Sequence, residues 1–222
     1  MFKEYTKRLI ICLIGLAVCG LGNFFGVKAG AVGTNSWNTL ALGISSFSGM
    51  SFGSATFAIS MGVIVIDLLG RGKLGFGTLL NATLIAAFSD VFLKLFSFIP
   101  EIQNSFAGVL STLLGQALIS LGTVIYMNAA LGCGPRDTLM VIIGKKTPRL
   151  PIGAVRFCLE FAVLIVGMLM GAPFGLGTLA VMVLQATIFQ FICNICRCEP
   201  RNIKHEDVFD TCKRIFKKRS VV

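Results

Sequence analysis

A short stretch of glycine and polar residues occurs twice in this chain, about 100 residues apart. The first copy runs from Ala31 to Leu40 as A-V-G-T-N-S-W-N-T-L, and the second runs from Ala130 to Leu139 as A-L-G-C-G-P-R-D-T-L. The match continues downstream, where the pattern G-x-G-T-L stands at 75–79 and again at 175–179. Self-similarity at a fixed spacing indicates one supersecondary unit used twice. The sequence therefore predicts two repeats, at 9–98 and at 106–195.

Long apolar runs separate the repeated motifs. The chain of 222 residues is 55% hydrophobic and 14% charged, with a mean hydropathy of +0.84, whereas a water-soluble domain has roughly 25% charged residues. Several runs approach the roughly 20 residues that a helix needs to cross a bilayer. They predict six spans, at 9–27, 52–69, 76–98, 106–130, 152–170 and 174–195. We therefore expect an all-α membrane protein in contact with the lipid bilayer.

Basic residues are concentrated in the segments that would face one side of the membrane. If the N-terminus is inside and there are six spans, 17 of the 20 basic residues lie on the inner side, as the positive-inside rule requires. The N-terminal tail (1–8) and the basic C-terminal tail (196–222) are then both cytoplasmic. The net charge of +10 is explained by this topology, and we expect no nucleic-acid partner. Three spans per repeat, an odd number, make the two repeats inverted relative to each other.

The two copies of the repeated stretch are too polar for full spans, and each predicts a broken or short helix. Thr34 or Asn35 can cap such a helix in the first copy. In the second copy, Gly134 and Pro135 are typical of a helix start, with Asp137 in the first turn. Inverted repeats with polar, glycine-broken segments at matching positions are typical of secondary transporters. In those proteins the helix starts face an anionic ligand group near the middle of the membrane.

The second copy closely resembles a known family signature. Residues 132–140 read G-C-G-P-R-D-T-L-M, and the YczE/YyaS/YitT family of bacterial membrane proteins has G-x-G-P-R-D-G-L-M. The first copy resembles the partner motif G-x-x-P-W-D, except that Ser36 and Asn38 replace its Pro and Asp. The resemblance covers roughly residues 10 to 195 and is closest to the YczE-like branch, because we expect no soluble C-terminal domain of the YitT type. It implies a multi-pass protein of the bacterial cytoplasmic membrane with no established substrate.

Polar and charged residues in or beside the apolar runs are the candidates for a functional site. The substrate-binding candidates are Asn35, Trp37, Asn38, Arg136 and Asp137. The proton- or ion-coupling candidates are Asp90, Arg156 and Glu160, because ionisable groups within a membrane are functional candidates by default. Each candidate has a structural alternative, such as helix capping, an interfacial position or an ion pair one turn apart.

Four further polar residues are expected to be structural. Asn81, Gln116 and Gln185 would form hydrogen bonds between helices, with a place along a pathway as the alternative. Asp67 lies near the inner end of a span, and we expect it to have a structural role.

No recognisable catalytic motif occurs in the sequence. There is no nucleotide-binding loop, nucleophile elbow or H-E-x-x-H motif, and the single histidine, His205, lies in the tail. The spacing of Cys193, Cys196 and Cys198 lacks a clean second pair of metal ligands. We therefore expect no enzyme, no metal and no cofactor.

The leading functional hypothesis is a small-molecule permease or exporter that rocks one repeat against the other. The alternative is a non-transporting binding or accessory subunit that docks on a partner complex. The substrate stays open, and so does the choice between a homo-oligomer and a partner membrane complex.

Overall fold

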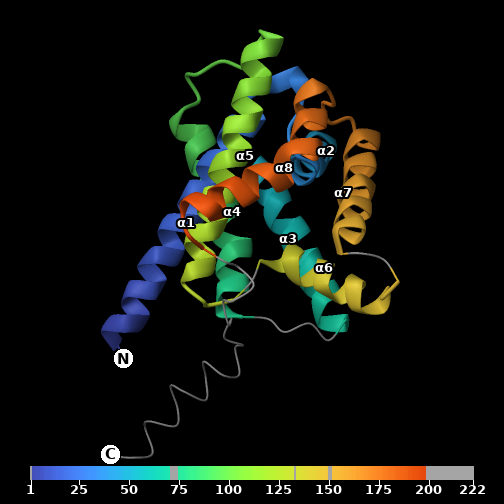
Figure 1. The fold of residues 1–222 in the computed structure, drawn as a ribbon. Coiled ribbons are helices and arrows are strands. Elements are labelled where there is room, and N and C mark those ends of the chain that lie inside the picture. Colours follow the sequence, from blue (N-terminus) through green and yellow to red (C-terminus); the bar gives the residue numbers. More distant parts are fainter. Residues whose placement is uncertain (1, 71–74, 133, 150–151, 199–222) are drawn as a thin grey trace, which may run out of the picture.

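The computed structural model describes residues 2–70, 75–132, 134–149 and 152–198, and its regular structure in these ranges is helical (Figure 1). Six long helices are α1 (Phe2–Lys28), α3 (Phe52–Leu69), α4 (Phe76–Leu95), α5 (Ser105–Asn128), α7 (Ile152–Leu169) and α8 (Leu176–Ile195). Two shorter helices, α2 (Ser36–Ser48) and α6 (Pro135–Lys146), occupy the two polar stretches, and a 3-10 turn at Gly30–Val32 precedes α2. The predicted all-α membrane fold is confirmed.

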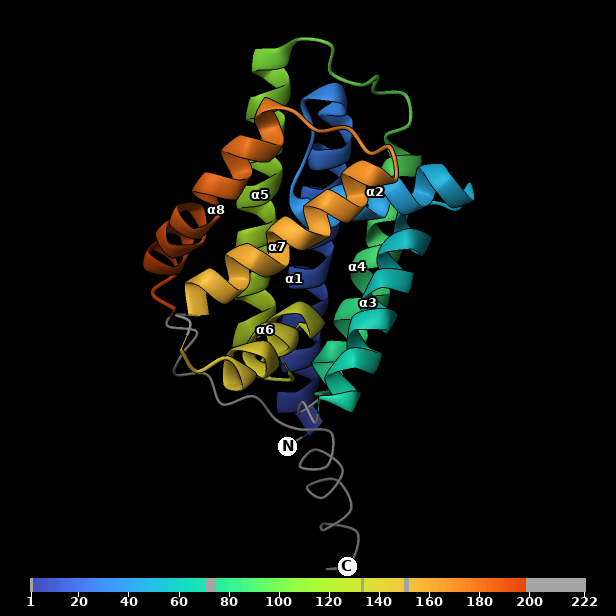
Figure 2. The same ribbon diagram turned by 90° about the vertical axis from the view of Figure 1, so that its right-hand side faces the viewer.

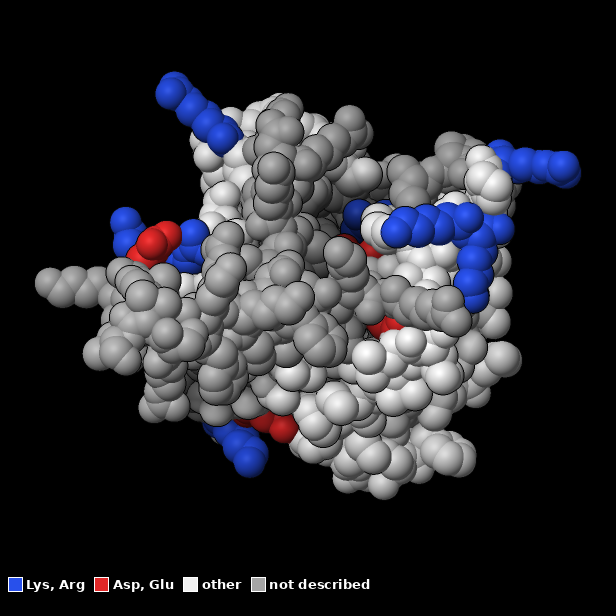
Figure 3. Space-filling view, turned by 90° about the horizontal axis from the view of Figure 1, so that it is seen from below, with Lys and Arg blue, Asp and Glu red and all other residues white. Residues whose placement is uncertain are grey.

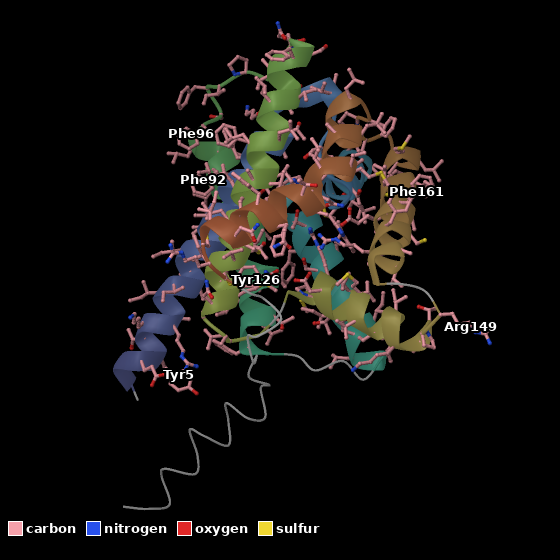
Figure 4. The ribbon with its side chains drawn as sticks, in the orientation of Figure 1. Tyr5, Phe92, Phe96, Tyr126, Arg149 and Phe161 are labelled. Atoms are coloured by element: carbon pink, nitrogen blue, oxygen red, sulfur yellow. The ribbon has the colours of Figure 1, made fainter. Side chains whose placement is uncertain are left out.

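Five of the long helices have the length and composition of membrane spans. They are Glu4–Lys28, Phe52–Leu69, Phe76–Leu95, Ser105–Asn128 and Leu176–Ile195. The span predicted at 152–170 corresponds to α7, which has 18 residues and whose side chains are described from Ala154 onward. On α7, Phe157 and Phe161 stack with ring centroids 6.1 Å apart and are about half exposed, and Phe161 lies at the edge of the molecule (Figure 4). The total of six spans stays a prediction.

The two predicted tails differ in what the structure describes. Helix α1 already begins at Phe2, so most of the predicted tail 1–8 continues the first helix. An ion pair between Glu4 and Arg8, 2.9 Å apart and one turn along the helix, supports this extension. Of the predicted tail 196–222, only 196–198 lies within the described residues.

Helices α1 and α5 run antiparallel beside each other (Figure 1 and Figure 2) and touch through glycines. A Cβ on Gly22 would lie 2.6 Å from the carbonyl oxygen of Gly115, and a Cβ on Gly122 would lie 2.5 Å from that of Gly15. Small residues allow helix backbones in a membrane to approach this closely. At the repeat spacing, Gly22 corresponds to Gly122 and Gly15 to Gly115, so the two contacts join equivalent positions.

Each polar break packs against the other half of the chain. A Cβ on Gly177 would lie 2.8 Å from the carbonyl oxygen of Gly33, before α2. In the matching place, the Gly77 amide donates a hydrogen bond of 2.8 Å to the carbonyl oxygen of Leu131, before α6. Gly33 and Gly132 have φ angles of +81° and +142°, which favour glycine. Helices α2 and α6 lie towards opposite ends of the molecule (Figure 1 and Figure 2).

Candidate functional site

A cavity of about 880 Å³ lies between the two halves of the chain, and each of the helices α1 to α8 in the described ranges contributes to its lining. The lining runs from the buried Thr56 and Gln116 to the exposed Lys145 and Lys146 at the end of α6, so the cavity reaches the surface there. Figure 3 shows a hollow on this face, in which acidic atoms lie between basic ones. Pockets of roughly 300–1,000 Å³ hold drug-sized ligands, so this cavity is large enough for a small molecule.

The start of α2 forms one wall of the cavity. Asn35 caps the helix, because its side-chain oxygen accepts a hydrogen bond of 3.0 Å from the backbone N–H of Asn38. The next residues, Ser36 and Trp37, also line the cavity, and Trp37 is 8% exposed. The sequence predicted a cap from Thr34 or Asn35, and Asn35 has this role.

The start of α6 lies against the start of α2. The Arg136 guanidinium carbon lies 4.6 Å from the centre of the Trp37 ring, within the range of a cation–π interaction. Trp37 and Arg136 occupy equivalent positions of the two repeated stretches. Pro135 is the first residue of α6 and Gly134 precedes it, as predicted. The two breaks thus meet at one place in the cavity, through one aromatic and one cationic side chain.

Three polar groups gather around Gly134. A Cβ at this glycine would lie 3.0 Å from the hydroxyl of Tyr126, 3.3 Å from a carboxylate oxygen of Asp137 and 3.5 Å from the side-chain nitrogen of Asn81. All three residues line the cavity, and Tyr126 lies in the interior of the molecule (Figure 4). Glycine leaves space here for these three side chains, which come from α4, α5 and α6.

A second polar cluster joins α7 to α8 across the cavity wall. The Arg156 Nε lies 3.2 Å from one carboxylate oxygen of Glu160, and the Gln185 side-chain amide donates a hydrogen bond to the other. Glu160 is 7% exposed, whereas the Arg156 side chain is 42% exposed. The cavity therefore holds both signs of charge, with Arg136 and Asp137 on α6 and Arg156 and Glu160 on α7.

Comparison with known proteins identifies the family. Residues 6–194 match a family described as "Family of unknown function (DUF6198)". The chain belongs to this family. An uncharacterized protein of Haemophilus influenzae is 34% identical over 195 residues, which are 88% of this chain and 87% of that protein. The uncharacterized membrane protein YczE of Bacillus subtilis is 30% identical over 195 residues, 86% of this chain and 87% of its own.

A further relative, YyaS of Bacillus subtilis, is 27% identical over 171 residues, which are 75% of this chain and 82% of that protein. No solved structure matches the chain. The resemblance to YczE and YyaS is therefore confirmed, and with it a multi-pass membrane protein.

Asn38, one of the positions that departs from the motif G-x-x-P-W-D, lies behind the cavity wall. It is 1% exposed, and its side-chain amide donates a hydrogen bond of 3.1 Å to the side-chain oxygen of Asn23. The Asn23 amide in turn donates to the Ser89 hydroxyl, 3.0 Å away. Asn38 thus ties α2 to α1 and α4, and Asn23 is the member of this chain of hydrogen bonds that lines the cavity.

Asp90 lies away from the cavity, at the start of α3. One carboxylate oxygen accepts a hydrogen bond of 2.7 Å from the Gly53 amide, and the other accepts one from the Ser51 hydroxyl. A carboxylate at this position satisfies free N–H groups and interacts favourably with the helix dipole. The structure thus brings Arg156 and Glu160 to the cavity but places the third coupling candidate, Asp90, at a helix cap.

Several polar lining residues were not singled out from the sequence. They are Asn23, Thr56, Ser60, Ser120, Thr123 and Tyr126. Their signal is polar residues at helical spacing inside apolar runs: Thr56 and Ser60 are four residues apart, which places both on one face of α3. Three further residues line the cavity: Asn81, Gln116 and Gln185. This position agrees with the alternative given for them above, a place along a pathway.

Proposed function

We propose that this protein is a permease or exporter of a small polar molecule across the bacterial cytoplasmic membrane, and that it catalyses no chemical reaction. The cavity supports this most directly, because the starts of both short helices reach it and meet there through Trp37 and Arg136. Transporters commonly bind their substrates between repeats, at the starts of broken helices.

We also propose that the two repeats are inverted and that transport rocks one against the other. Three observations support this arrangement: the antiparallel contact of α1 with α5 through equivalent glycines, the crosswise packing of the two breaks, and the positions of α2 and α6 towards opposite ends. With both termini cytoplasmic, as the basic residues favour, the mouth of the cavity beside Lys145 faces the cytoplasm.

The proposed ligand carries an anionic group. Arg136 and Arg156 offer guanidinium groups to the cavity, and guanidinium forks bind carboxylates and phosphates well. The positive ends of the helix dipoles at the starts of α2 and α6 add to the attraction for an anion. Asp137 and Glu160 provide a place for a cationic group of the same molecule or for a coupling ion.

A ligand screen followed by a flux measurement tests this proposal. Purified protein is screened for thermal stabilisation by small carboxylates, phosphates and zwitterions, because a ligand that binds the folded state raises its stability. We expect some ligands to raise the melting temperature of the native protein and of the Arg149→Gln variant, but not that of the Arg136→Gln variant. Arg149 is a matched control, since it is exposed and lies away from the cavity lining (Figure 4).

The ligands that bind are then tested for gradient-driven flux into proteoliposomes. Flux that Arg136→Gln abolishes and Arg149→Gln retains is the expected result. Binding without flux would contradict the permease and favour the alternative, a binding subunit; a stoichiometric partner recovered in mild detergent would then identify that role.

The inverted arrangement is tested by sidedness. In a background from which the native cysteines are replaced, single cysteines are placed at the exposed positions Ser46, at the end of α2, and Arg149, beyond α6. We expect a membrane-impermeant maleimide to label Ser46→Cys from outside intact cells and Arg149→Cys only after permeabilisation. Labelling of both from one side would exclude inverted repeats.

A further inference from the structure

Asp67 is a buried acidic residue that neither lines the cavity nor belongs to its polar clusters. It lies near the end of α3, is 0% exposed, and neither of its carboxylate oxygens has a hydrogen-bond partner among the described residues. An ionised carboxylate in such surroundings is strongly unfavourable. Asp90 of α4 differs in this respect, because both of its carboxylate oxygens accept hydrogen bonds from residues at the start of α3.

The Asp67 side chain belongs to the face of α3 that packs against α6. Val63, one turn before it, lies in the same apolar cluster as Leu139 of α6. Three residues after it, a Cβ on Gly70 would lie 2.8 Å from a methyl group of Ile142, also of α6. Residues three and four apart on a helix share a face. Asp67 therefore lies on α3 between Val63, which shares an apolar cluster with Leu139, and Gly70, which approaches Ile142.

This helix crossing borders the cavity. Gly70 and Ile142, on either side of the contact, both line it. A movement of α6 away from α3 would thus bring the Asp67 carboxyl into contact with the water of the cavity. Such a movement would also change the contact at the other end of α6, where Arg136 lies over the Trp37 ring.

We propose that Asp67 is a proton-binding site whose charge state controls the docking of α6 on α3. The neutral carboxyl packs into the closed crossing. When α6 moves away, the carboxyl releases its proton to water in the cavity, and the resulting carboxylate, which needs hydration, holds the crossing open. Rebinding of a proton from water allows α6 to dock again. This goes beyond the proposed function, and its test needs no transported substrate.

Other charged groups on the helices around α3 do not pair with Asp67 in the part of the chain that the structure describes. Helix α6 carries Arg136, Asp137, Lys145 and Lys146, helix α4 carries Asp90 and Lys94, and α2 carries no charged residue. Arg71 and Lys73 follow α3 in the sequence and lie outside the described residues. Asp137, at the start of α6, is the other acidic residue whose protonation could be linked to a movement of that helix.

The fluorescence of Trp37, the single tryptophan of the chain, tests the proposal on the purified full-length protein in lipid nanodiscs. We expect the native protein to show one single-proton transition as the pH is raised. Asp67→Asn should lose this transition and keep the low-pH signal throughout, because asparagine is neutral and close to the acid in shape. Asp90→Asn and His205→Gln should retain the transition. A transition that is missing in the native protein, that survives in Asp67→Asn, or that is lost in Asp137→Asn instead would overturn the proposal.

Infrared spectroscopy gives a second readout that does not require the variant to fold. At neutral pH the native protein should show the carbonyl stretching band of a protonated carboxylic acid, shielded from exchange with deuterated water. Absence of this band in the native protein overturns the proposal by itself. If Asp67→Asn folds, persistence of the band in that variant does the same.

Discussion

The two short helices cross their partner helices in different ways. Helix α2 packs against α7 through glycines: a Cβ on Gly167 would lie 2.7 Å from the backbone nitrogen of Leu40, and a Cβ on Gly43 would lie 2.8 Å from the carbonyl oxygen of Gly167. At the repeat spacing, the crossing of α6 with α3 has Asp67 in place of Gly167 and Ile142 in place of Gly43. The first crossing thus brings two backbones together, whereas the second includes the side chains of Ile142 and Leu139 on α6. Because side chains repack more easily than backbones, α6 is the short helix better suited to move.

The cavity walls show a related difference. Thr56 and Ser60 of α3 line one part, and their equivalents at the repeat spacing, Arg156 and Glu160 of α7, line another. Trp37 and Arg136 form a third such pair. Positions one repeat spacing apart in the sequence thus lie around one cavity, and the charged member of each pair is the C-terminal one. In the proposed arrangement of two repeats, the shape of the site follows from the duplication, and its chemistry follows from the residues that differ between the two copies.

The largest expected effect comes from filling the glycine crossing. Gly167→Leu puts a side chain where a Cβ alone meets the backbone of α2, so the two helices must separate. Overpacking of this kind costs about 3 kcal/mol, and we expect a corresponding fall in the melting temperature of the detergent-solubilised protein.

Gly62→Ala provides the control for this substitution. Gly62 lies within α3, is exposed and would meet nothing within 4 Å of an added Cβ. Alanine is favoured over glycine in a helix by about 1 kcal/mol, so this variant should melt at the same temperature or higher. Equal destabilisation by Gly167→Leu and Gly62→Ala would show that the loss at Gly167 does not come from its close contact with α2.

A smaller loss of stability is expected at the ion pair of α7. Glu160→Ala leaves the Arg156 guanidinium and the Gln185 amide without their acceptor. Since Arg156 is 42% exposed, solvent compensates part of the loss, and we expect a decrease in stability of about 2 kcal/mol, comparable to a hydrogen bond to a charged group.

Ser60→Ala is the matched change at the equivalent position of the first repeat, and it should alter the unfolding free energy by less than about 1 kcal/mol. Chemical denaturation in mixed micelles measures both. Equal losses from the two variants would mean that the first repeat contributes to the polar wall as strongly as the second.

The features that the sequence predicted well depend on local signals. The apolar runs, the cap at Asn35 and the proline start of α6 are properties of neighbouring residues, and the structure confirms them. The contact of Arg136 with Trp37 and the burial of Asp67 depend on how distant helices pack. No spacing along the chain contains that information, which explains why Asp67 was expected to have only a structural role.

An intermediate effect is expected at the meeting point of the two breaks. Arg136→Gln removes the cation from the face of Trp37, an interaction worth about 1.5 kcal/mol in a partly desolvated place. The change should also alter Trp37 fluorescence, because the indole ring loses its charged neighbour. Trp37→Phe, which keeps an aromatic face, should cost less than Arg136→Gln in thermal unfolding. A larger loss from Trp37→Phe would show that packing of the ring, and not its contact with the cation, joins the two breaks.

The smallest effect concerns the residue that begins each short helix. Asn35 accepts the hydrogen bond from the Asn38 amide at the start of α2, whereas its equivalent Gly134 gives α6 no side-chain cap. Asn35→Ala should cost about 1 kcal/mol, and Asn35→Gly only a few tenths, because glycine leaves the N–H groups open to water. Thermal unfolding of the two variants compares them directly. The predicted order would explain how α6 can begin at a glycine, with the space around it given to Tyr126 and Asp137; the reverse order would mean that the Asn35 cap contributes nothing specific to α2.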